Sequence, residues 1–224
     1  MENDVSLTHD GDSWRTFRIT SEFVQGFEAM MSIGPSVSFF GSARITPEDA
    51  YYKIAHDLAF KIAKKGFAII TGGGPGTMVA ANQGAQAAGG KSCGLCIDLP
   101  QEEEPNLYID RKYLLRFRYF FVRKVMFIRY AQAFVVLPGG FGTIDELFEA
   151  LTLMETGKIK KFPIILIGKD YWTGLIQWMR ETVEAKHHHI SPEQFDLFLI
   201  TDNLDTAVRA IENYYNTEKC VLNF

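Results

Sequence analysis

The chain has 224 residues, of which 47% are hydrophobic, enough for one domain with a sizeable core. Its formal net charge of −4 argues against a nucleic-acid-binding protein, which would carry a basic face. We expect no membrane span and no signal peptide, because no apolar run is long enough and the first residues are polar and acidic. With three cysteines in the whole chain, we expect a protein of the reducing cytoplasm.

The beginning of the chain is predicted to lie outside the main fold. Residues 1–13 are expected to form a flexible tail, and residues 14–224 a single domain. Apolar side chains recur at near-helical spacing over residues 14–33, which predicts an amphipathic helix that Gly34 and Pro35 end. This helix is expected to pack on the body of the protein or on a second subunit.

The first predicted strand, residues 37–40, is followed by a turn of small residues at 41–44. In open α/β sheets, ligands bind beyond the carboxyl ends of strands. Ser42 is therefore a candidate donor to a phosphate, and Arg44 would attract one. A tight turn with a solvated arginine explains the same residues without a ligand.

The next helix is expected to have Thr46 as its N-cap and to end at Gly66. A second strand over residues 67–71 leads into a second glycine turn. The residues of this turn that we expect to bind phosphate are Gly72, Gly73 and Gly74. The turn matches neither the dinucleotide nor the Walker fingerprint, and no lysine follows it, which points to a mononucleotide or sugar phosphate.

A third strand is predicted over residues 92–97, with a further short strand near 113–116. Cys93 and Cys96 lie three apart in the third strand and should point to opposite faces, which favours two buried thiols over a redox or zinc pair. The acidic loop at 98–112 is expected to be solvated surface, with a lid over a pocket as the alternative.

The segment 119–130 is dense in apolar residues and predicts a largely buried helix. Arg123 and Lys124 lie inside it, where basic side chains need a partner or a cleft. Both are therefore candidates for binding an anion. The alternative is that each pairs with a nearby carboxylate.

The stretch 134–149 contains the strongest local signal, since a buried strand over 134–137 leads through a turn into a helix. The glycines of this turn are Gly139, Gly140 and Gly142. Thr143 and Glu146 have the spacing of a capping box. Free N–H groups and the helix dipole would favour a phosphate here. The competing interpretations are a simple tight turn, and a glutamate that serves only as a cap.

Further strands are expected at 164–167 and 198–201, with helices at 171–185 and from Asp202 or Asn203 onward. The run 187–189 of three histidines is expected to be a surface loop, because consecutive histidines do not converge on one ion. The alternation of strands and helices predicts an α/β fold: a single Rossmann-like, doubly wound, mainly parallel sheet with helices on both faces.

Two motifs together resemble the LOG family of cytokinin-activating phosphoribohydrolases, once labelled lysine decarboxylases. They are Phe-Val-Arg-Lys-Val-Met at 121–126 and Pro-Gly-Gly-Phe-Gly-Thr-Ile-Asp-Glu at 138–146. The turns at 41–44 and 71–76 also look like turns of that family. The similarity covers roughly residues 36–215, and the length looks like the longer bacterial branch.

The resemblance implies hydrolysis of the N-glycosidic bond of a nucleoside 5′-monophosphate, without metal or cofactor. Its catalytic pair would fall on Arg123 and Glu146, and its phosphate-binding turn on residues 139–143. The predicted helices at 118–130 and at the N-terminus carry more apolar surface than one small sheet needs, so we expect a homodimer or higher homo-oligomer. The resemblance implies a site near the dimer interface. Asp145 replaces a common glutamate, whereas Tyr119 and Phe120 replace the Met-His of shorter relatives and leave base specificity open.

Two other classes of function compete with this hydrolase. A non-catalytic nucleotide or cofactor carrier or sensor would use the same fold, because fold does not decide function. A pyridoxal phosphate-dependent decarboxylase is disfavoured, because no Schiff-base lysine with a partner for the pyridinium nitrogen is evident.

Overall fold

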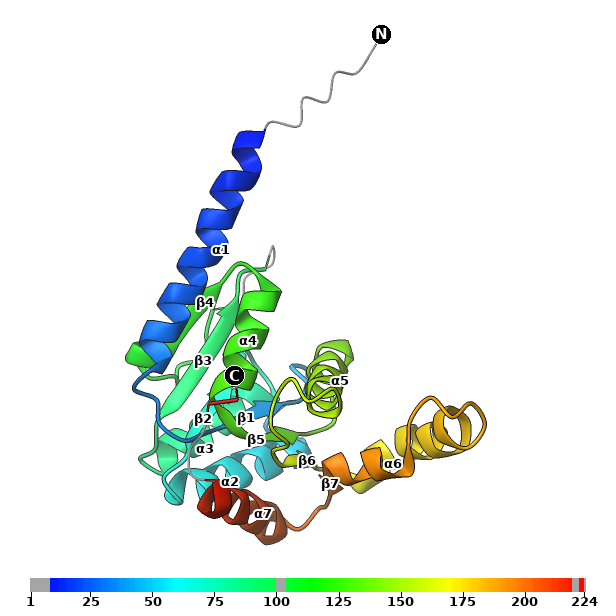
Figure 1. Ribbon diagram of the computed structural model, residues 1–224. Coiled ribbons are helices and arrows are strands. Elements are labelled where there is room, and N and C mark those ends of the chain that lie inside the picture. The colour runs from blue at the N-terminus through cyan, green and yellow to red at the C-terminus, as the bar shows by residue number, and fades with distance from the viewer. Residues whose placement is uncertain (1–8, 100–103, 219–221, 224) are drawn as a thin grey trace.

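The structure is a computed structural model that describes residues 9–99, 104–218 and 222–223 (Figure 1). Seven parallel strands form one sheet in the order β4-β3-β2-β1-β5-β6-β7. The strands are β1 (Ser36–Phe40), β2 (Ala68–Thr71), β3 (Ser92–Ile97), β4 (Leu114–Phe117), β5 (Ala131–Val136), β6 (Ile164–Leu166) and β7 (Phe198–Ile200). Most are apolar and fully buried, as expected for a parallel sheet covered on both faces.

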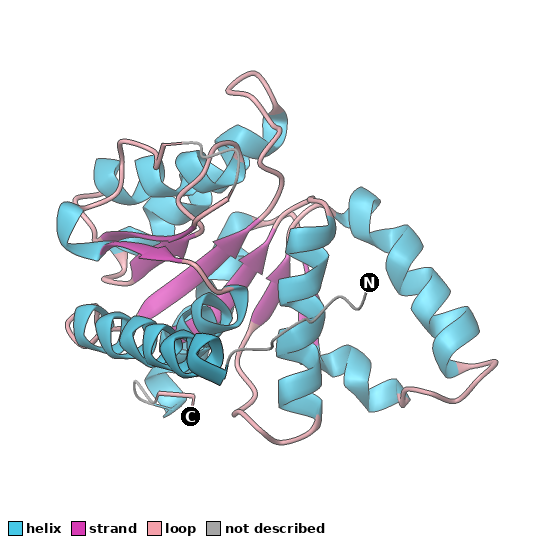
Figure 2. Cartoon of the chain, turned by 90° about the horizontal axis from the view of Figure 1, so that it is seen from above, coloured by secondary structure: helices cyan, strands magenta, loops and turns pink. Residues whose placement is uncertain are grey.

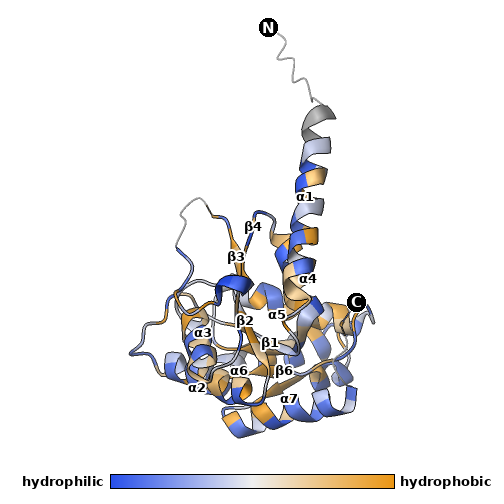
Figure 3. Ribbon diagram, turned by 90° about the vertical axis from the view of Figure 1, so that its left-hand side faces the viewer, coloured by the Kyte–Doolittle hydropathy of each residue, from blue (hydrophilic) through white to orange (hydrophobic). Residues whose placement is uncertain are grey.

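Helices cover both faces of this sheet (Figure 2). One apolar cluster joins the sheet to α2 (Ala50–Lys64), α3 (Thr77–Ala87) and α7 (Leu204–Glu218). The other joins it to α1 (His9–Met30), α4 (Phe120–Tyr130), α5 (Phe141–Glu155) and α6 (Lys169–Trp178). In Figure 3 the strands that can be seen are mainly hydrophobic, whereas the coloured part of α1 carries both hydrophilic and hydrophobic residues. The predicted doubly wound α/β fold is therefore confirmed.

The chain reverses its direction across the sheet at β1. The first four strands run outward from β1 to β4, and α4 then returns the chain so that β5 pairs with β1 on its other side. Ligands of doubly wound sheets bind at such a switch point, beyond the carboxyl ends of the two central strands. The turns after β1 and β5 are therefore placed side by side.

Two helix starts differ from the sequence-based expectation. The helix α2 begins at Ala50, with Asp49 as its N-cap accepting from the Tyr51 N–H at 2.8 Å, so Thr46 is not the cap. The Thr46 hydroxyl instead donates to the Glu48 carboxylate at 2.5 Å. The helix α1 begins at His9, inside the segment expected to be a tail, while residues 1–8 lie outside the described part.

Other local predictions agree with the structure. Gly66 has a positive φ of 91° directly after the C-cap of α2. Asn203 caps α7 by accepting from the Thr206 N–H at 2.9 Å. Asp202 instead accepts from the N–H groups of Gly168 and Lys169, at the start of α6. Both candidate caps are used, but for different helices.

The region of β3 also follows the prediction in part. Cys93 and Cys96 are free, buried thiols. Cys93 contacts Met30, whereas Cys96 lies near the turn at Gly73. The described part of the loop at 98–112 is more than solvated surface. Asn106 there donates to the carbonyls of Gly73 and Gly74, while residues 100–103 lie outside the described part.

Beyond α6 the chain continues as a π-helix (Met179–Glu184) and reaches the three histidines. His187, His188 and His189 are exposed, as expected for a surface loop. Two short 3-10 helices complete the fold, Arg111–Tyr113 and Pro192–Leu197. No helix within the described residues is long and apolar enough to cross a membrane.

Candidate functional site

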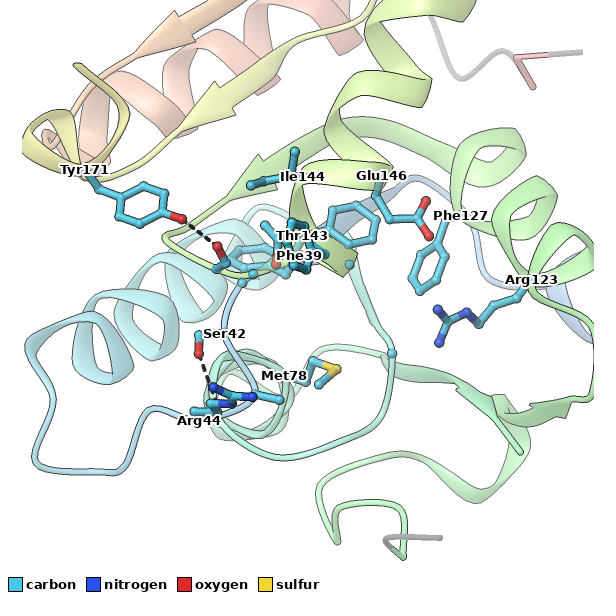
Figure 4. Close-up of a pocket in the computed structure, with 18 residues that line it drawn as sticks. Phe39, Ser42, Arg44, Met78, Arg123, Phe127, Thr143, Ile144, Glu146 and Tyr171 are labelled. Carbon is cyan, nitrogen blue, oxygen red and sulfur yellow. Dashed lines mark hydrogen bonds between the residues drawn. The ribbon is translucent and has the colours of Figure 1, made fainter. Parts of the chain in front are cut away.

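A pocket of about 720 Å³ lies at the switch point, where the turns after β1, β2 and β5 meet (Figure 4). The Ser42 backbone joins these turns: its N–H donates to the Pro138 carbonyl at 2.9 Å, and its carbonyl accepts from the Thr77 N–H at 2.9 Å. The Ser42 hydroxyl accepts from the Arg44 N–H at 3.0 Å. Ser42 and Arg44 both line the pocket, so the turn predicted to bind phosphate does face it.

The floor of the pocket is the glycine turn after β5, with Gly139, Gly140, Gly142 and Thr143 among its lining residues. The helix α5 begins at Phe141 with Gly140 as N-cap, so Thr143 is in its first turn and the predicted capping box is wrong. The N–H groups of Phe141 and Gly142 donate to no described backbone carbonyl. They are therefore available to an anion.

Close packing explains why this turn needs glycine at one position. A Cβ atom on Gly139 would lie 2.7 Å from the Thr143 Cβ and 3.0 Å from the Gly41 carbonyl carbon. Gly140 and Gly142 have open space around the same position. Gly139 therefore serves packing, and the other two keep the approach to the backbone unobstructed.

The second glycine turn reaches the pocket only at its first residue. Gly72 lines the pocket, whereas Gly73 and Gly74 do not and instead hold Asn106 through their carbonyls. The Asn106 amide also donates to the Asn82 side-chain oxygen at 3.0 Å, within a buried polar network. The structure thus gives Gly73 and Gly74 a role in shaping the turn, and the prediction that they bind phosphate is not supported.

Arg123 reaches the pocket from α4, whose end is fixed over β1 by two buried serines. Ser36 donates to the Tyr130 carbonyl at 2.7 Å, and Ser38 to the Phe127 carbonyl at 3.2 Å. The Arg123 guanidinium lies 5.0 Å from the centre of the Phe120 ring. Its Nε is buried without a hydrogen-bond partner in the described structure. Burial lowers the pKa of Arg123, which the Glu146 carboxylate opposes.

Glu146 projects into the same pocket from the second turn of α5 and is only 4% exposed. Its Oε2 has no hydrogen-bond partner among the described residues. Burial raises the pKa of Glu146 from 4.5 to about 7, although the charges of Lys124 and Arg123 lower it. Glu146 does not cap its helix, so the interpretation as a cap alone is wrong.

Lys124, which was predicted to bind the substrate, points away from the pocket. Its Nζ lies 2.8 Å from carboxylate oxygens of both Asp145 and Glu149, and it does not line the pocket. Burial alone would lower the pKa of Lys124, but these two contacts raise it. The alternative of pairing with local carboxylates is therefore correct for Lys124 and wrong for Arg123.

Several lining residues were missed by the sequence-based prediction. They are Phe39, Phe40, Met78, Phe127, Phe141, Ile144 and Tyr171. Most are apolar side chains whose periodicity indicated only burial. Tyr171 had a usable signal, because it follows β6 and so lies at the same edge of the sheet as the glycine turns. No group of three or more potential metal ligands occurs within the described ranges.

The sequence of this chain is similar to those of a known protein family. The model of the family described as "Possible lysine decarboxylase" matches residues 78–211. Cytokinin riboside 5′-monophosphate phosphoribohydrolase of Mycobacterium tuberculosis is 30% identical over 160 residues, covering 70% of this chain and 83% of that protein. The protein of the same name from Mycobacterium marinum is 29% identical over 159 residues, with the same coverage.

The fold of this chain is also similar to those of solved structures. The structural genomics target TM1055 aligns with a TM-score of 0.59 at 25% identity, covering 80% of this chain and 99% of that one. The molybdenum cofactor carrier protein of Chlamydomonas reinhardtii aligns at 0.58 and 19% identity, covering 82% and 99%, which shows the fold alone. The family match over more than half of the chain, with the curated relatives, shows that this protein belongs to the LOG family, whose family model bears the lysine decarboxylase description.

Proposed function

We propose that this protein hydrolyses the N-glycosidic bond of a purine nucleoside 5′-monophosphate, AMP or a cytokinin riboside monophosphate, to free base and ribose 5-phosphate. The observation that carries the proposal is the buried carboxylate of Glu146, whose Oε2 has no hydrogen-bond partner in the described part of the chain. It lies in the pocket that also presents the N-terminus of α5. The names of the related phosphoribohydrolases support the same reaction.

The phosphate is assigned to the end of the pocket formed by the glycine turn. The N–H groups of Phe141 and Gly142 and the positive end of the α5 dipole favour an anion there. Ser42 and Arg44 lie together on one side of this end (Figure 4). A 5′-phosphate held at this end would contribute binding energy that positions the sugar for reaction.

The sugar is assigned to the region beside Glu146. Cleavage of the bond between C1′ and the base makes the ribose oxocarbenium-like, and an ionised carboxylate stabilises the charge that develops at C1′. Water then forms the new bond to C1′ and gives up a proton, with Glu146 as the base, and the departing nitrogen takes up a proton. Among the described residues that line the pocket, none other than Glu146 is a carboxylic acid.

Arg123 is assigned to the sugar or the phosphate as a positioning cation. It lies on the same side of the pocket as Glu146, and Arg44 lies on the opposite side (Figure 4). The guanidinium fork suits two adjacent oxygens, such as ribose hydroxyls or phosphate oxygens. Its Nε is buried without a partner in the described structure, and the Phe120 and Phe127 ring centres lie 5.0 Å and 5.6 Å from the guanidinium.

The direct test is to incubate the purified protein with AMP and with N6-substituted adenosine monophosphates and to measure free base and ribose 5-phosphate. We expect equal amounts of both products. Tight AMP binding with no release of base would instead support the nucleotide or cofactor carrier, the competing function on this fold. A panel of nucleoside monophosphates then ranks the bases, which decides between AMP and cytokinin nucleotides.

Pyridoxal phosphate, which a decarboxylase would require, does not fit this pocket. No lysine is present among the lining residues in the described part of the chain, so none offers a Schiff base. Lys124, the basic residue next to Arg123 in sequence, is held by two carboxylates outside the pocket. The purified protein should therefore show no pyridoxal absorbance after incubation with the cofactor and desalting.

The cellular context follows from the same observations. Free, buried Cys93 and Cys96 are consistent with the reducing cytoplasm that we expect. We also assign a homodimer, which exposed apolar residues of α1 support. Trp14, Phe17 and Val24 are 66%, 68% and 49% exposed and share one side of the helix, whereas Phe23 and Phe27 on another side pack on the body.

A further inference from the structure

One contact reaches the glycine turn from a distant part of the chain. The Tyr171 hydroxyl donates to the Gly139 carbonyl at 2.5 Å (Figure 4). Tyr171 belongs to the first turn of α6 and lines the same pocket. It is the only donor to this carbonyl among the described residues.

The start of α6 is held in place by its surroundings, and the Tyr171 ring itself is 44% exposed. At the start of α6, Asp202 accepts from the Gly168 N–H at 2.8 Å and the Lys169 N–H at 3.1 Å. The neighbouring Trp172 is fully buried, donates to the Ile167 carbonyl at 3.0 Å and meets the Tyr171 ring edge-on. These contacts fix the backbone from which Tyr171 projects, and the Trp172 ring supports one side of the Tyr171 ring.

The contact selects the orientation of one peptide unit. The Gly139 carbonyl and the Gly140 N–H belong to the same planar trans peptide, so they point in opposite directions. Glycine on both sides of this peptide leaves it free to adopt other orientations. With the carbonyl bound to Tyr171, the Gly140 N–H points away from that hydroxyl, and it donates to no described acceptor.

We propose that Tyr171 is a positioning residue: its hydroxyl holds the Gly139–Gly140 peptide so that the Gly140 N–H faces the phosphate of a bound nucleotide. Rotation of this peptide would present a carbonyl oxygen to the phosphate and replace attraction with repulsion. The inference rests on the proposed function, because it takes the glycine turn as the phosphate site. It adds a residue outside the paired motifs to that site.

The test is Tyr171→Phe, which keeps the ring and removes only the hydroxyl. Losing one hydrogen bond of this kind should weaken AMP and inorganic phosphate about fivefold to tenfold. We expect KM for AMP to rise by that factor while kcat changes less than about twofold, and adenosine, which lacks the phosphate, to inhibit as before. Tyr51→Phe is the matched control, because the Tyr51 hydroxyl lies near Gly168 but not on the turn.

Binding without hydrolysis separates this inference from the proposed reaction. AMP is titrated calorimetrically into Glu146→Gln and into the double variant that also carries Tyr171→Phe. Weaker AMP binding by the double variant, with adenosine binding unchanged, supports the role of Tyr171 even if the wild type releases no base. Equal AMP affinity in the two proteins, or an equal loss for adenosine, overturns it.

Discussion

Arg123 and Glu146 face one pocket from two different helices, and the Phe127 ring lies between their side chains (Figure 4). No ion pair within 4.0 Å joins them in the described structure, although each charge influences the pKa of the other. Both groups are therefore left available for a ligand. If the guanidinium and the carboxylate formed an ion pair with each other, fewer of their hydrogen-bonding groups would be available to a substrate.

Replacement of the carboxylate by an amide tests its role in the reaction. Glu146→Gln keeps the size of the side chain and removes the charge that would stabilise the oxocarbenium ion. We expect kcat for AMP to fall about 10²-fold or more, with nucleotide affinity retained. Steady-state kinetics and AMP titration measure the two quantities. Hydrolysis by the variant at the wild-type rate would refute the assignment.

The pH dependence of the reaction should report the Glu146 carboxyl. Its pKa of about 7 predicts that kcat/KM rises with pH through this value, because the ionised form is the active one. Lys124→Met removes a charge that lowers this pKa, so the rise should move to higher pH. Lys158→Met, an exposed lysine just after α5, is the control and should leave the profile unchanged. An unshifted profile in Lys124→Met would show that another group controls the rate.

The buried Glu146 carboxyl should lower the free energy of unfolding at high pH. Its folded pKa of about 7 lies above the ordinary 4.5, so folding is favoured while the group is protonated, and stability is lost as the pH rises from 4.5 through 7. The loss is about 3–4 kcal/mol at most, since the folded pKa lies about 2.5 above the ordinary one and each pKa unit is worth about 1.4 kcal/mol. Denaturant unfolding should show Glu146→Gln more stable than wild type at pH 8, with little difference near pH 4.5.

A control for this stability effect is Glu155→Gln, at the exposed end of α5. Glu155→Gln removes the charge of a carboxylate that is already exposed to solvent, so it should change the free energy of unfolding little at either pH. If Glu146→Gln is no more stable than wild type at pH 8, burial does not disfavour the ionised form.

The glycine turn offers a matched pair of substitutions. Gly139→Ala would place a Cβ against the Thr143 side chain and the Gly41 backbone, at a cost of about 1–3 kcal/mol. Gly142→Ala meets open space within a helix, where alanine is preferred to glycine by up to about 1 kcal/mol. Thermal unfolding should therefore separate the two variants in opposite directions. Equal melting temperatures would contradict the packing described for Gly139.

The homodimer is tested on the exposed side of α1. A charge introduced by Phe17→Glu should convert the dimer to a monomer, because an unpaired carboxylate cannot be buried cheaply in an apolar interface. Arg15→Glu carries the same new charge on another side of α1 and serves as the control. Light scattering coupled to size exclusion measures the mass. A monomeric wild type, or an unchanged dimer in Phe17→Glu, would contradict this interface.

The sequence predicted regular elements better than their ends. Buried strands and glycine turns are local patterns, so the core of each strand and the order of elements follow from periodicity alone. Helix starts are decided by competition among neighbouring caps. Asp49 rather than Thr46 begins α2, and Gly140 rather than Thr143 begins α5. At α2, the Thr46 hydroxyl donates to the Glu48 carboxylate, and Asp49 is the residue that accepts from the first turn.

By itself the sequence determined a parallel α/β sheet, glycine turns at its carboxyl edge and the two motifs that contain Arg123 and Glu146. Only the tertiary structure decided that Arg123 faces the pocket while Lys124 turns to Asp145 and Glu149. It also brought Tyr171 onto Gly139, which lies 32 positions earlier in the chain. The physical reason is that adjacent helical residues point about 100° apart, and the packing partners of a helix decide which of them meets the ligand.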